Sequence, residues 1–274
     1  MRGAKYHQQK QWEARSLGES FIDLRGAKLH LYRAGKGAPL LFLHGVDGIL
    51  GWPPCLEHLA RRFDVAAPDH PGFGQSDAPD WIADVADLGF FYLDLIAALD
   101  LKAVHVVGAS LGGWIALEMA IRSTARIKSL TLVGAAGIRV AGVPRGDMFI
   151  GTPAELGRLL FADEQAAAHW SAQWQASPAA QEIYDRNRAT AAKYTWQPRL
   201  YNPKLADWLH RIDVPTHIIW GEQDKLIPPA YATALQALIP GAQVTMLPGG
   251  HLLPSERPDL FADTVSPFIE RLRP

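Results

Sequence analysis

The chain has 274 residues, a formal net charge of −1 and 48% hydrophobic residues, a composition typical of a globular protein with one large domain or a domain plus a lid. The near-neutral charge provides no attraction to nucleic acid or to an anionic membrane. The single cysteine, Cys55, excludes an intrachain disulfide, and no Cys/His cluster has zinc-site spacing. Because the stretch Met1–Ser20 is polar and no apolar run reaches membrane-spanning length, we expect a cytoplasmic protein.

The first third of the chain predicts a hairpin followed by alternating strands and helices. Residues 20–24 and 28–32 alternate with period two around Arg25-Gly26-Ala27, which indicates an antiparallel hairpin at a sheet edge. The apolar run Leu40–Leu43 indicates a buried parallel strand. Further strands are expected at 63–67 and 104–107, with a helix over 85–99 between them.

The alternation of strand and helix is interrupted once. After a strand at 129–133, residues 139–202 show no buried strand and divide into short helical pieces at Gly151-Thr152-Pro153, Ser177-Pro178 and Gln197-Pro198. Strands are expected again at 216–220 and 243–247, and a helix over about 257–272. This order predicts an α/β fold with a mostly parallel, doubly wound sheet of about eight strands and helices on both faces.

The pentapeptide Gly108-Ala109-Ser110-Leu111-Gly112 stands between the strand at 104–107 and a helical run. A serine at a sharp strand-to-helix turn is how one class of hydrolases exposes its nucleophile, and small residues two positions on either side avoid a clash. The helix that follows directs free N–H groups at the same point. The motif therefore makes Ser110 a candidate nucleophile.

An acid and a histidine follow in the order that such a nucleophile requires. Asp224 comes just after the strand at 216–220, and His251 comes just after the strand at 243–247. The carboxyl ends of parallel strands meet at one edge, so Ser110, Asp224 and His251 are expected to converge there. Asp224 could instead be a simple turn residue; its nearest rival, Asp213, precedes a strand and belongs to the opposite edge.

From about Leu40 to the C-terminus the chain resembles the α/β-hydrolase family. The resemblance includes Leu41–Gly45 as the oxyanion-loop strand, Pro68–Asp77 as the next turn, Gly221–Asp224 and Gly250-His251 as the acid and base loops, and Glu256–Pro258 at the last helix. It implies a core domain formed by 1–138 and 203–274, and a helical cap formed by 139–202.

The resemblance also implies a role for each site residue. Ser110 would be the nucleophile, His251 the base that takes its proton, and Asp224 the acid that orients the imidazole. The backbone N–H groups of Leu111 and Val46 would form the oxyanion hole. No cofactor and no metal are implied, the only partner expected is a small-molecule substrate, and the oligomeric state stays open.

The substrate pocket is expected at the loops and cap around Ser110. Trp170 and Trp174 share a helix face; they would form either the cap's own core or an apolar roof over Ser110. The residues expected to line the pocket are His44, Asp47, Trp114, Phe149, Trp170, Trp174 and Leu252.

We expect hydrolysis of a small, apolar carboxylic ester through an acyl-enzyme intermediate. Dehalogenases and epoxide hydrolases of the family carry Asp where this chain has Ser110. The capped ring-cleavage hydrolases are similar in layout, and carbon–carbon bond hydrolysis is therefore an alternative, although they commonly carry Trp where Leu252 stands. A slow-turnover small-molecule receptor of the same fold is the other alternative.

Overall fold

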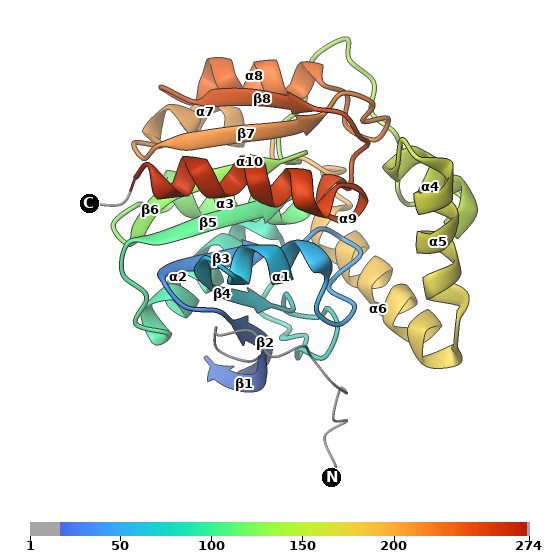
Figure 1. Ribbon diagram of the computed structural model, residues 1–274, viewed down its shortest axis with the longest axis horizontal. Helices are drawn as coiled ribbons and strands as arrows, with labels where there is room; N and C mark the ends of the chain where they lie inside the picture. Colours follow the sequence, from blue (N-terminus) through green and yellow to red (C-terminus); the bar gives the residue numbers. More distant parts are fainter. Residues whose placement is uncertain (1–16, 273–274) are drawn as a thin grey trace.

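A central eight-stranded sheet dominates the computed structural model, which describes residues 17–272 (Figure 1). The polar N-terminal stretch of the sequence up to residue 16 lies outside the described residues. The strand order is β1-β2-β4-β3-β5-β6-β7-β8. The strands are β1 (Gly18–Leu24), β2 (Ala27–Ala34), β3 (Ala38–Leu43), β4 (Phe63–Pro68), β5 (Val104–Ala109), β6 (Ile127–Val133), β7 (Thr216–Gly221) and β8 (Gln243–Leu247).

Strands β1 and β2 form the antiparallel hairpin expected at the sheet edge. They are joined by Arg25 and Gly26, both with positive φ (55° and 80°), the conformation of a tight two-residue hairpin turn. Strand β2 also pairs antiparallel with β4, and every later pairing in the sheet is parallel. The expected α/β fold with a mostly parallel sheet of about eight strands is confirmed.

Helices cover both faces of the sheet. Helices α1 and α10 pack together on one face, and α2 and α3 pack together on the other (Figure 1). Each face buries its own apolar cluster, because the central parallel strands are apolar on both sides. The core helices are α1 (Pro54–Ala60), α2 (Val85–Ala98), α3 (Leu111–Arg122), α7 (Leu205–Trp208), α8 (Ala230–Leu238), α9 (Leu253–Glu256) and α10 (Pro258–Glu270), with a 3₁₀ helix at Leu209–Arg211.

The stretch between β6 and α7 forms three helices that we call the cap helices. They are α4 (Pro153–Leu160), α5 (Glu164–Gln175) and α6 (Pro178–Thr195), and they lie beyond the carboxyl end of β7 (Figure 1). Thr152, Asp163 and Ser177 cap their N-termini, and each side chain accepts a hydrogen bond from a backbone N–H in the first turn. A bridge between Gly137 and Tyr201 brings the two ends of this stretch together. The division of the chain at 139 and 202 remains a prediction.

Candidate active site

Ser110 occupies a strained turn between β5 and α3. Its backbone has φ 53° and ψ −111°, a conformation that residues other than glycine rarely adopt. The Ser110 N–H donates to the carbonyl of Val133 at 2.8 Å, which ties the turn to the neighbouring strand β6. The side chain is therefore held at the carboxyl edge of the sheet, and it is only 6% exposed.

The two glycines of the motif are required by close backbone contacts. A Cβ on Gly108 would lie 2.3 Å from the carbonyl oxygen of Gly112, and a Cβ on Gly112 would lie 2.0 Å from the carbonyl oxygen of Leu43. No real side chain fits such distances, so the turn can form only with glycine at both positions. This is the physical reason for the spacing seen in the sequence.

His251 links Ser110 to Asp224. His251 Nε2 lies 2.9 Å from Ser110 Oγ, and His251 Nδ1 lies 2.7 Å from Asp224 Oδ2. Because the carboxylate can only accept, Nδ1 carries the proton and Nε2 is free to accept from the serine hydroxyl. All three side chains are buried. The structure thus brings the three predicted residues into one hydrogen-bonded chain.

The other Asp224 oxygen is held by backbone groups. Asp224 Oδ1 accepts from the N–H of Leu226 at 2.9 Å and from the N–H of Ile227 at 2.8 Å. These two bonds orient the carboxyl group, so that Oδ2 points to His251. Asp213, the rival acid, instead accepts a hydrogen bond from the hydroxyl of Thr124 at 2.6 Å.

Two small cavities meet at Ser110. The first, about 10 Å³, is lined by apolar side chains together with Arg145, and the residues Val46 and Leu111 expected at the oxyanion hole also line it. Leu111 is the first residue of α3, where a backbone N–H has no acceptor within the helix. The second, about 20 Å³, is lined by His251 as well as Ser110. We call them the first and the second Ser110 cavity.

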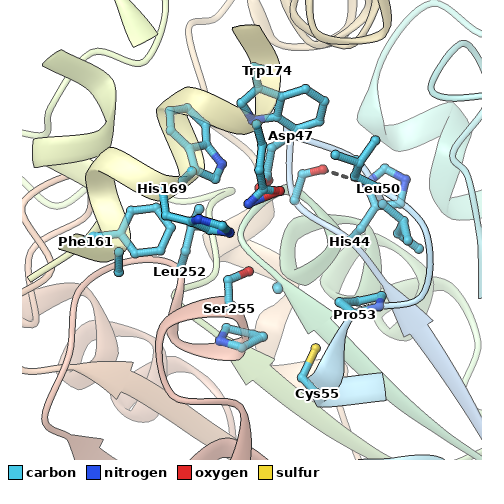
Figure 2. Close-up of a pocket in the computed structure, with 18 of the residues that line it drawn as sticks. His44, Asp47, Leu50, Pro53, Cys55, Phe161, His169, Trp174, Leu252 and Ser255 are labelled. Atoms are coloured by element: carbon cyan, nitrogen blue, oxygen red, sulfur yellow. Dashed lines mark hydrogen bonds between the residues drawn. The ribbon is translucent and has the colours of Figure 1, made fainter. Parts of the chain in front are cut away.

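The predicted pocket residues are distributed unequally. Trp114 lines the first Ser110 cavity, and Asp47, Trp170 and Leu252 line the second. His44 and Trp174 line a separate, larger cleft, together with Asp47, Trp170 and Leu252 (Figure 2). The two cap tryptophans also pack against each other, with ring centroids 6.5 Å apart, so that they belong to the cap's core and to a cavity wall at once.

Phe149 lies away from these three cavities. Its ring packs against Trp196, with centroids 5.8 Å apart, and the Arg199 guanidinium lies over it. The neighbouring Met148 lines both Ser110 cavities instead. The segment before α4 is irregular, so hydrophobicity alone could not show which of these two adjacent side chains turns inward.

Three residues that were not predicted line the second Ser110 cavity, namely Tyr184 and Arg188 of α6 and Leu226. Arg188 donates to the Tyr184 hydroxyl at 3.0 Å and to the carbonyl of Phe149 at 3.2 Å. Within residues 17–272 no carboxylate lies within ion-pair distance of Arg188. The four-residue spacing of Tyr184 and Arg188 was the available signal for a shared helix face.

His44 and His70 brace the loop that follows β3. The His70 backbone N–H donates to His44 Nε2 at 3.0 Å, so the proton of His44 is on Nδ1, which donates to the Gly45 carbonyl at 2.6 Å. The His70 ring contacts the Tyr92 hydroxyl and the His44 carbonyl. Burial lowers the pKa of both histidines, which keeps them neutral and preserves this bonding. Val46 follows directly after this braced segment.

Among residues 17–272, no group of three or more His, Cys, Asp or Glu side chains is arranged to hold a metal ion. In the same range, no helix combines the length and apolar composition that crossing a bilayer requires.

The sequence matches the family model described as alpha/beta hydrolase fold over residues 38–258. The chain therefore belongs to the α/β-hydrolase fold family. The 2-hydroxymuconate semialdehyde hydrolase of Pseudomonas sp. (strain CF600) is 30% identical to it, over 89% of this chain and 91% of that protein.

Solved structures show the same fold. The meta-cleavage product hydrolase CumD from Pseudomonas fluorescens IP01 has a TM-score of 0.74 at 23% identity, covering 94% of this chain and 99% of that one. The esterase RhEst1 from Rhodococcus sp. ECU1013 has a TM-score of 0.74 at 22% identity, covering 94% of this chain and 100% of that one. Proteins with this fold thus include a meta-cleavage product hydrolase and an esterase.

Proposed function

We propose that this protein hydrolyses small, apolar carboxylic esters through an acyl-enzyme intermediate on Ser110. The observation that carries the proposal is the buried chain of hydrogen bonds from Ser110 Oγ to His251 at 2.9 Å and from His251 to Asp224 at 2.7 Å. A serine hydroxyl becomes a useful nucleophile when a neighbouring base accepts its proton, and the geometry here meets that requirement.

In the first half of the reaction, Ser110 Oγ attacks the ester carbonyl carbon while its proton passes to His251 Nε2. The positive charge on the imidazole is stabilised by Asp224, which faces Nδ1. The oxyanion that forms would be held by the backbone N–H groups of Val46 and Leu111. The ester C–O bond then breaks, the leaving alcohol takes the proton from His251, and the acyl group stays on Ser110.

The two Ser110 cavities suit different halves of such a substrate. The leaving oxygen receives its proton from His251, so the leaving group belongs in the second Ser110 cavity, which His251 lines. The acyl group then belongs in the first cavity, among Trp114, Leu226 and Ile227. In the second half of the reaction, water attacks the acyl-enzyme with His251 as base, and the carboxylic acid is released.

The test is hydrolysis of p-nitrophenyl esters of increasing acyl length by the wild type and by Ser110→Ala. We expect turnover by the wild type only, with an optimum at short acyl chains because the first cavity is small. Ser123→Ala, at the C-cap residue that follows α3 and outside the three cavities, is the matched control and should keep wild-type rates. Turnover by Ser110→Ala above about a tenth of the wild-type rate would exclude Ser110 as the nucleophile.

Carbon–carbon bond hydrolysis is a second candidate, and the observation in its favour is Arg188. The Arg188 guanidinium lines the proposed leaving-group cavity and has no carboxylate within ion-pair distance in the described part of the chain. Such a group suits a substrate fragment that ends in a carboxylate. The relatives named as hydrolases of 2-hydroxymuconate semialdehyde and of 2-hydroxy-6-oxo-2,4-heptadienoate act on compounds of this kind. Incubation with 2-hydroxy-6-oxo-2,4-heptadienoate tests it: release of acetate would support this candidate, and its absence would leave ester hydrolysis alone.

A further inference from the structure

A cleft that Ser110 does not line is larger than either of the two Ser110 cavities. It has a volume of about 180 Å³ and lies between cap helix α5 and the loops after β3 and β8 (Figure 2). The two Ser110 cavities have volumes of about 10 Å³ and about 20 Å³. A buried water needs roughly 10–15 Å³ on this scale, so each Ser110 cavity has space for about one water, whereas the cleft has space for a small organic group.

The cleft and the second Ser110 cavity share a wall. Asp47, Trp170 and Leu252 line both of them, and Trp170 belongs to cap helix α5. The second Ser110 cavity is the one that His251 lines, and it therefore receives the leaving group of the proposed reaction. A leaving group too large for that cavity would have to pass these three side chains to enter the cleft.

The wall of the cleft combines flat apolar surface with unmatched hydrogen-bonding groups. The indole rings of Trp170 and Trp174 line it, and Trp174 Nε1 is buried with no hydrogen-bond partner among residues 17–272. The Trp170 indole N–H faces Asp47 without reaching hydrogen-bond geometry. Burial raises the pKa of Asp47, whose carboxyl group lacks the full solvation of an exposed acid. A partner that both accepts and donates hydrogen bonds would satisfy these groups.

The outer part of the cleft is polar, and its thiol is inert. His169 and Ser255 are exposed side chains that project into the cleft (Figure 2). Burial raises the pKa of the Cys55 thiol to about 12, so it stays protonated and is no nucleophile. The cleft thus offers contacts for binding and, apart from its shared wall, no group that would react.

We propose that the cleft is the distal leaving-group subsite, and that it takes a flat, neutral group carrying a hydroxyl or a primary amide. Such a group donates to Asp47, accepts from Trp174 Nε1 and stacks on the indole rings. A carboxylate in the cleft would be repelled by Asp47, because Arg188 lines the second Ser110 cavity and not the cleft. The inference rests on the proposed ester hydrolysis, which places the leaving group in the second Ser110 cavity, and it adds the chemical class of that leaving group.

The kinetic test compares three aryl acetates that differ only in the para substituent: phenyl acetate, 4-carbamoylphenyl acetate and 4-carboxyphenyl acetate. Each kcat/KM is divided by the rate constant of hydroxide-catalysed hydrolysis of the same ester, which removes the difference in leaving-group reactivity. We expect the carbamoyl ester to exceed phenyl acetate by about tenfold, which corresponds to one net hydrogen bond, and the carboxy ester to fall below it. Equal normalised values for all three esters would overturn the inference.

Two variants test the wall directly. Trp174→Phe removes the indole N–H and keeps an aromatic ring, and Leu252→Trp places a larger side chain in the shared wall. Both should reduce the preference for the carbamoyl ester to near one. Trp208→Phe, at a site 48% exposed and outside the cleft, is the matched control and should keep the preference. Retention of the full preference in both wall variants would overturn the inference.

A binding measurement separates this inference from the proposed function. We would titrate the product alcohol 4-hydroxybenzamide into Ser110→Ala and into Ser110→Ala/Trp174→Phe by calorimetry. Binding that the second change weakens about tenfold, in a protein whose wild type hydrolyses no ester, would support the cleft and overturn the proposed function. Ester turnover without 4-hydroxybenzamide binding and without the para-substituent preference would support the function and overturn the cleft inference.

Discussion

The Glu256 carboxylate accepts a hydrogen bond from the backbone N–H of Gly250, the residue before His251, at 2.7 Å. Its other oxygen accepts from the N–H groups of Ala162 at 3.1 Å and Asp163 at 2.9 Å, at the start of cap helix α5. One side chain therefore fastens the loop of the proposed base to the cap. Glu256 does not touch the reacting atoms and would act as a positioning residue through His251.

Glu256→Gln should lower kcat by about tenfold with little change in KM. An amide replaces one acceptor oxygen by an NH₂ group, which faces a backbone N–H and cannot bond it, so the His251 loop loses part of its support. Steady-state kinetics on a p-nitrophenyl ester would measure the change. Glu222→Gln, in the exposed turn before Asp224, is the control. A change in KM alone would show that Glu256 shapes the pocket and does not position His251.

Asp224→Asn should reduce kcat by about 10³- to 10⁴-fold, because an amide in place of Oδ2 favours the wrong imidazole tautomer. The variant should fold normally, since the remaining carbonyl oxygen can still accept from Leu226 and Ile227. Asp213→Asn, the rival acid bonded to Thr124, should change kcat less than twofold. A loss below about tenfold for Asp224→Asn would place the acid elsewhere.

Ile227→Ala should shift the preferred acyl chain to a length about two carbons greater, because Ile227 lines the first Ser110 cavity and is buried. The measurement is kcat/KM along the p-nitrophenyl ester series, from acetate to octanoate. Ile227→Val, which removes one methyl group, should shift the optimum less. An unchanged optimum in both variants would show that the acyl group does not enter this cavity.

Gly112→Ala should destabilise the protein by about 3 kcal/mol and abolish turnover, because its Cβ would meet the Leu43 carbonyl oxygen at 2.0 Å and the backbone must move. Urea unfolding measures the loss. Gly18→Ala is the matched control, since a Cβ there lies 3.8 Å from its nearest neighbour. Wild-type stability for Gly112→Ala would contradict the close approach of α3 to β3.

His217 should make the protein less stable at acid pH. It lies on β7 against Phe268, and burial, with Arg271 nearby, lowers its pKa to about 4. In the unfolded chain the imidazole pKa is about 6.5, so the unfolded state alone takes up this proton as the pH falls from about 6.5 towards 4. The stabilisation that comes from His217 is therefore fully present above about pH 6.5 and is lost as the pH falls towards 4.

The loss of stability attributable to His217 between pH 8 and pH 5 should be about 1–2 kcal/mol, after allowance for partial solvent screening. Urea unfolding at both pH values would compare the wild type with His217→Gln, which retains a hydrogen-bonding group for the Thr245 hydroxyl. The variant should lose less stability than the wild type. An equal loss in both proteins would show that His217 is not the group that titrates.

The sequence by itself determined the frame of the fold and the order of the three predicted catalytic residues. The reason is local, because apolar runs and period-two alternation define the strands. Glycines mark the turn at Ser110, because a side chain at Gly108 would meet the Gly112 backbone and one at Gly112 would meet the Leu43 backbone. Asp224 and His251 could be assigned because parallel strands end at a common edge. Proline and the capping residues also marked the starts of α4 and α6.

Only the tertiary structure decided how the cap meets that edge. The packing of α4, α5 and α6 over the sheet decides which of Met148 and Phe149 turns inward. It also decides that Arg188 reaches the cavity beside His251. The cleft behind Asp47, Trp170 and Leu252 is lined by four segments that lie far apart in the chain. Packing between such segments follows from the summed fit of many side chains, which no local pattern in the sequence records.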